Sequence, residues 1–122
     1  MRNALNWFEI PATDFQRARG FYQTILDVDM PIESMPNCRL ALFPYREPGV
    51  GGAVVEMDKM KPGQDGVKVY LNGGNDMRPI LDRIEDAGGK IMLPRQQISP
   101  EIGYIALFAD TEGNLIGLHS PN

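Results

Sequence analysis

Residues 104–119 read YIALFADTEGNLIGLH, two short apolar runs separated by a polar turn. The runs at 104–108 and 115–119 have the length and the composition typical of β-strands. The segment 110–114 between them combines Asp, Gly and Asn, which are the residues that favour a tight turn. The stretch therefore predicts that the chain ends in a β-hairpin.

The same order of elements is predicted on both sides of the middle of the chain. Upstream of the hairpin, a strand at 67–71 precedes a helix capped by Asp76, and a strand at 90–93 follows. In the first half, a strand at 5–10 precedes a helix capped by Asp14, and strands follow at 30–32, 38–43 and 53–57. The chain therefore reads as βαβββ twice, with a spacing of about 60 residues.

This pattern predicts a single α+β domain over residues 1–122. Module 1 covers about residues 4–60 and module 2 about residues 66–120, and the polar stretch between them is the linker. Each module buries one face of its sheet under its helix and leaves the other face to curl. We expect two curled mixed sheets around a cleft, which is the usual form of a small-molecule site.

Composition excludes several classes of function. The chain has 12 Lys and Arg against 16 Asp and Glu, one His and one Cys. One His and one Cys cannot build a structural zinc site, and one Cys cannot form an intrachain disulfide. Scattered basic residues in an acidic chain argue against nucleic acid as a partner, and no apolar run approaches the about 20 residues that span a bilayer. We expect a cytoplasmic protein.

Several segments resemble the vicinal oxygen chelate superfamily, which includes glyoxalase I, extradiol dioxygenases and bleomycin-resistance proteins. The resemblance lies in residues 7–14, 17–18, 21–22, 69–72, 87–89 and 103–119. It implies paired βαβββ modules, commonly a homodimer, and a cavity in each curled sheet. In the enzymes of the family a divalent metal is ligated from the first and last strands of each module. Aligned here, those positions are Trp7, Glu56, Lys68 and Gly117.

Only Glu56 of these four residues could bind a metal, whereas catalytic sites generally need about three protein ligands. The loss of three of the family's four metal-ligand positions speaks against glyoxalase I and extradiol dioxygenase chemistry. No cofactor is therefore favoured. An alternative remains, because strand residues two apart share a face. Glu9 and His119 could then converge with Glu56 on a divalent ion such as Ni, Zn, Mn or Fe.

Individual residues admit both a structural and a functional interpretation. Aromatic side chains on strands are most often core, but they could line the cleft and stack on a flat ligand. Lys68 is either solvated or a partner for an anionic ligand. Glu9, in an apolar strand, either pairs with Lys68, Arg39 or Tyr70 or acts on a ligand, including as a metal-free acid or base. The predicted ligand-binding set is Trp7, Glu9, Lys68, Tyr70, Tyr104, Phe108 and His119.

The leading hypothesis is a binding or sequestering protein, similar to bleomycin-resistance proteins. It would form a homodimer and bind a small organic molecule without a tightly held metal. The alternative is a metal-dependent lyase, isomerase or dioxygenase that uses Glu9, Glu56 and His119. Fold features are shared across the whole superfamily, so the residues specify the fold more strongly than the reaction.

Overall fold

The computed structural model describes residues 3–122, which form two four-stranded sheets and two helices. The sheets have the strand orders β1-β4-β3-β2 and β5-β8-β7-β6. In each sheet one pair is parallel: β1 pairs with β4, and β5 pairs with β8. The repeated βαβββ pattern and the α+β class are therefore confirmed. The elements are β1 (Trp7–Pro11), α1 (Phe15–Leu26), β2 (Ile32–Met35), β3 (Cys38–Leu42), β4 (Gly51–Met57), β5 (Tyr70–Asn72), α2 (Arg78–Ile84), β6 (Lys90–Ser99), β7 (Gly103–Ala109) and β8 (Leu115–Ser120).

Helix α1 begins at the cap that the sequence predicts. The carboxylate of Asp14 accepts a hydrogen bond of 3.1 Å from the backbone N–H of Arg17, one of the donors left unpaired in a first helical turn. The helix ends at Asp27, which adopts a left-handed conformation with φ 55°. The apolar face predicted from the spacing is buried, so this helix covers the first sheet with the residues that the pattern selects.

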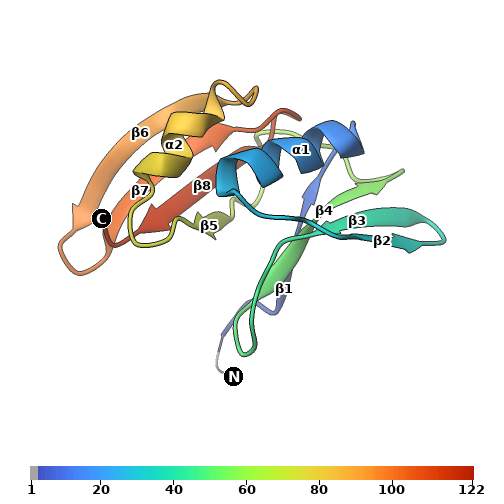
Figure 1. Cartoon of the computed structure of the whole chain (residues 1–122), viewed down its shortest axis with the longest axis horizontal. Helices are drawn as coiled ribbons and strands as arrows, with labels where there is room; N and C mark the ends of the chain where they lie inside the picture. Colours follow the sequence, from blue (N-terminus) through green and yellow to red (C-terminus); the bar gives the residue numbers. More distant parts are fainter. Residues whose placement is uncertain (1–2) are drawn as a thin grey trace.

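One hydrophobic core joins the two modules. The ring of Tyr22 packs against Phe43 of module 1 and Phe108 of module 2, with ring centroids 5.3 and 6.4 Å apart. Helices α1 and α2 lie next to each other and cover the same side of the molecule (Figure 1). Because the helix-covered face of each sheet contributes to this core, the helix-free face of each sheet points outward. We call these the outer faces.

Several element boundaries differ from the prediction. Gly51 and Gly52 belong to β4 rather than to a turn, because the ring of Tyr45 lies against one glycine and the ring of Phe8 against the other. Strand β6 continues through Pro94 to Ser99, with register shifts that interrupt its pairing with β7. Strand β5 and helix α2 are shorter than expected. None of the helices within residues 3–122 has the length and apolarity needed to cross a membrane.

The turn before β8 fastens module 2 to module 1. The side chain of Glu112 is completely buried. Its carboxylate accepts hydrogen bonds from the backbone N–H groups of Thr13 at 2.9 Å and Asp14 at 2.7 Å, and from Nε of Arg17 at 2.8 Å. Glu112 therefore binds the N-terminal end of α1 from the opposite module. A negative charge at this end also interacts favourably with the positive end of the helix dipole.

A second buried group strengthens the same junction. Asp110, 5% exposed, accepts a hydrogen bond of 2.7 Å from the hydroxyl of Tyr22. Burial raises the pKa of Tyr22 well above its ordinary value, and the nearby charge of Asp110 adds to the effect. The side-chain amide of Asn114 donates to Asp110 at 3.0 Å and to the carbonyl of Pro11 at 2.8 Å. The modules are thus joined by a satisfied polar network as well as by apolar packing.

This junction predicts a loss of stability in acid. Burial alone would raise the pKa of Glu112, but the hydrogen bonds from Arg17, Asp14 and Thr111 outweigh it and lower the pKa below 4.5. Stability from a lowered carboxyl pKa is present above the unfolded pKa and is lost as pH falls through the folded pKa. The difference between wild type and Glu112→Gln in urea unfolding should therefore be full above pH 4.5, the ordinary carboxyl pKa, and should shrink as the pH falls further. An equal difference at every pH would contradict the assignment.

Candidate functional site

The outer face of the second sheet presents an aromatic surface. Tyr70 on β5 is the register partner of Gly117 on β8, and Asn72 is the partner of His119. A side chain at Gly117 would clash with the ring of Tyr70, so this ring lies flat against the sheet only because position 117 is glycine. Tyr70 is 44% exposed, which leaves the other side of its ring open to a ligand.

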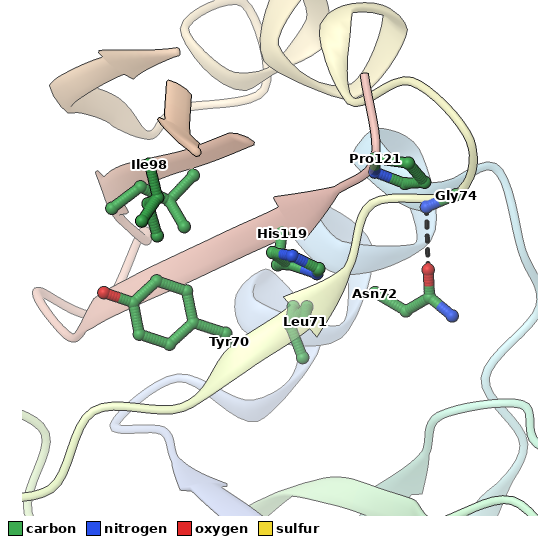
Figure 2. A pocket seen from close by; sticks show the side chains of 8 residues that line it. Tyr70, Leu71, Asn72, Gly74, Ile98, His119 and Pro121 are labelled. Atoms are coloured by element: carbon green, nitrogen blue, oxygen red, sulfur yellow. Dashed lines mark hydrogen bonds between the residues drawn. The ribbon is translucent and has the colours of Figure 1, made fainter. Parts of the chain in front are cut away.

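A hollow of about 630 Å³ lies beside this ring. Tyr70, Ile98 and His119 point into it from β5, β6 and β8 (Figure 2). Nε2 of His119 lies 2.6 Å from the carbonyl oxygen of Ile102, and a carbonyl can only accept, so Nε2 carries a proton. The hollow combines apolar walls with few polar groups, the composition usual for small-molecule sites.

The outer face of the first sheet carries the equivalent residues of module 1. Trp7 is the register partner of Gly51, and the ring of Tyr45 lies against that glycine, with its centroid 6.4 Å from that of Trp7. Glu9 accepts a hydrogen bond of 3.3 Å from the indole N–H of Trp7, in place of the predicted partners Lys68, Arg39 or Tyr70. Glu9 also lines a separate hollow of about 430 Å³ beside the linker.

Glu56 faces away from Glu9. It pairs with Arg39 at 2.9 Å, and the guanidinium of Arg39 lies 4.4 Å from the ring centroid of Phe15 in α1. Glu56 is therefore on the helix-covered face of β4, whereas Glu9 is on the outer face of β1. The alternation of a strand explains this, because Glu9 is aligned with Ala53, three residues from Glu56.

The expected convergence of Glu9, Glu56 and His119 is therefore not observed. Glu9 and His119 line different hollows, and Glu56 faces the helix. Across the described part of the chain, no group of three or more His, Cys, Asp or Glu side chains is arranged to hold a metal ion. Within residues 3–122, such a group is formed neither by the four positions aligned with the family's metal ligands nor by the alternative set of Glu9, Glu56 and His119.

Two of the predicted aromatic ligand residues belong to the interior. Phe108 is 0% exposed and packs against Phe21, with centroids 5.9 Å apart, so its assignment to the cleft is corrected to the core. Tyr104 lies on the same face of β7, and the guanidinium of Arg95 covers its ring at 3.7 Å. Both residues are an even number of positions from core residue Ala106, which explains why they share its face.

Lys68 precedes β5 and is exposed, with Nζ 5.6 Å from the ring centroid of Tyr70. The structure therefore brings Lys68, Tyr70 and His119 to one region and leaves Trp7 and Glu9 on the other sheet. Ile98 and Ile105 also line this hollow, and neither was predicted from the sequence. The alternation of a strand puts Ile105 on the face of β7 that Tyr104 does not occupy. The orientation of Ile98 could not be predicted in this way, because register shifts in β6 interrupt the alternation.

Known proteins with this architecture can now be compared. No protein-family model matches the chain. A glyoxylase-like domain-containing protein of Didymella fabae is 27% identical, over 93% of this chain and 91% of that protein. A solved glyoxalase/bleomycin resistance protein from Streptomyces sp. CB03234 superimposes with a TM-score of 0.73 at 22% identity, over 96% of this chain and all of that one.

The chain has the vicinal oxygen chelate fold. An antibiotic binding protein from the same Streptomyces strain shares this fold with a TM-score of 0.72 at 23% identity, covering 98% of this chain and 97% of that one. A maize glyoxalase I variant matches 95% of this chain with a TM-score of 0.70 at 17% identity. This chain spans only 45% of that enzyme's length. The resemblance in fold inferred from the sequence is thus confirmed.

Proposed function

We propose that this vicinal oxygen chelate protein binds a small organic molecule on its outer sheet faces, without a tightly held metal ion. The observation that carries the proposal is the exposed ring of Tyr70 beside a hollow of about 630 Å³. A flat aromatic or heterocyclic ligand would stack on this ring and contact Ile98 and Ile105. The antibiotic-binding relative from Streptomyces supports a binding role rather than catalysis.

A second copy of the chain would complete the site. The outer faces expose large side chains, among them Trp7 at 39%, Tyr70 at 44% and Ile98 at 49%. Large apolar side chains exposed on the face of a sheet are a common feature of interaction sites. In a two-fold homodimer the outer face of one module would meet the other module of the partner, which would convert two open hollows into enclosed clefts.

The single unpaired Cys38 supports a cytoplasmic location.

Binding is tested with chelator-treated protein. Quenching of Trp7, the single tryptophan, is measured against bleomycin and a set of planar aromatic compounds, and light scattering gives the mass. We expect a dimer, and we expect Tyr70→Ala to weaken binding of the best compound about tenfold, the loss of about 1.4 kcal/mol of stacking. Tyr104→Phe is the matched control and should bind as wild type does.

The result that would overturn the proposal is equally specific. Binding that vanishes after chelation and returns with Ni, Zn, Mn or Fe would favour a metal site instead. Equal affinity of wild type and Tyr70→Ala, with Tyr104→Phe weakened, would place the ligand away from the outer face.

A further inference from the structure

A second cavity lies between the two modules, on the helix-covered side of the sheets. Its volume is about 660 Å³, within the range of small-molecule pockets. Phe8, Leu26, Phe43 and Val50 form the module 1 wall, and residues 67–72 form the module 2 wall. It adjoins the outer-face hollow, with which it shares Tyr70, Leu71, Asn72 and Gly74. It extends from there toward the core, where Phe8 packs on Phe43 with ring centroids 5.4 Å apart.

The lining of this inter-module cavity is mostly apolar, with the polar side chains of Tyr70 and Asn72 and one positive charge. Lys68 is the single charged residue of the lining, and no Asp or Glu side chain contributes to it. Within residues 3–122 the salt bridges involve Arg17, Arg39 and Arg78, so Lys68 has no carboxylate partner in that range. A mostly apolar lining that includes a single lysine complements a molecule that has an apolar body and one anionic end.

We propose that the inter-module cavity binds an apolar monocarboxylate. Its hydrocarbon body would lie against Phe8, Leu26 and Val50, where burial contributes about 0.8 kcal/mol for each CH₂ group removed from water. Its carboxylate would stay at the mouth beside Nζ of Lys68, which already lies 5.6 Å from the centroid of the Tyr70 ring. The charge of the whole chain, −4, repels anions, so Lys68 provides the local attraction.

The charge requirement is tested with three probes of one chain length. Dodecanoate, dodecanol and dodecyltrimethylammonium are titrated into the protein below their aggregation concentrations and followed by calorimetry. We expect dodecanoate to bind at least about tenfold more tightly than either of the others. In Lys68→Gln its affinity should fall to that of dodecanol. Lys90→Gln removes an exposed lysine at the start of β6 and is the matched control, so it should behave as wild type.

The position of the ligand is tested separately. Val50→Trp fills the inter-module cavity and should abolish dodecanoate binding, whereas Ile98→Trp fills the outer-face hollow and should leave it unchanged. Lys68→Glu reverses the charge at an exposed position, so this variant should bind dodecyltrimethylammonium more tightly than dodecanoate. It also tests the proposal independently, should Val50→Trp fail to fold. Equal affinities of dodecanoate and dodecanol for wild type, an unchanged preference in Lys68→Glu, or loss of binding in Ile98→Trp alone would overturn the proposal.

Discussion

Replacement of Phe108 by alanine is expected to lower the free energy of unfolding by about 3–5 kcal/mol. The side chain is 0% exposed and contacts the rings of Phe21 and Tyr22, so its removal leaves a cavity where both modules meet. Alanine also removes aromatic contacts that contribute beyond the buried area. Urea denaturation should show a lower midpoint with an unchanged slope, which indicates a change in stability rather than in compactness.

Tyr70→Ala is the matched control for this prediction. Tyr70 is also an aromatic strand residue, but it is 44% exposed on the outer face. Its replacement should cost less than about 1 kcal/mol, as is usual for substitutions outside the core. If Phe108→Ala unfolds like wild type while Tyr70→Ala is severely destabilised, the assignment of the two faces is wrong.

Glu112→Ala is expected to lower the free energy of unfolding by about 1–3 kcal/mol. The substitution leaves the N–H groups of Thr13 and Asp14 without their acceptor and removes the partner of Arg17. Thr13 and Asp14 are exposed, so water can reach their N–H groups in the variant, and the expected loss is that of a helix cap and of hydrogen bonds to a charged acceptor. Because Arg17 is half exposed, the ion pair itself adds little, and most of the loss comes from the backbone donors.

Two variants separate this effect from a simple change of charge. Glu101→Ala removes an exposed carboxylate from the turn between β6 and β7 and should change stability by less than about 0.5 kcal/mol. Glu112→Gln keeps one acceptor oxygen for the helix N–H groups and should lose less than Glu112→Ala. Chemical denaturation of the three variants at pH 7 gives the comparison, and equal losses in Glu101→Ala and Glu112→Ala would refute the capping role.

Most elements could be predicted from local sequence, because their signals are local. The cap at Asp14, the apolar face of α1 and the hairpin around residues 110–114 are each specified within a few residues. The strand predicted at 53–57 starts two residues too late, because glycine usually weakens a strand and so excludes Gly51 and Gly52 from the prediction. What keeps them in β4 is contact with Tyr45 and Phe8, and no local pattern reveals such contacts.

The candidate site was harder to predict because it depends on which face of a strand is covered. Alternation correctly grouped Trp7 with Glu9 and Gly117 with His119, but it did not say that Phe108 faces the helices. Glu56 and Glu9 lie on paired strands, and their relative orientation follows from the register, which the sequence does not state. The partnership of Glu112 with α1 spans 95 residues or more and was likewise hidden.

Trp7 and Tyr70 occupy the same position in their two modules, each aligned with a glycine on the last strand of its sheet. Both positions lie on outer faces, apart from the shared core. A single methyl group at Gly117 would tilt the ring of Tyr70 away from the sheet, and one at Gly51 would do the same to Tyr45. Under the function proposed above, a substitution at either glycine would therefore reshape a ligand-binding face without changing a residue of the shared core.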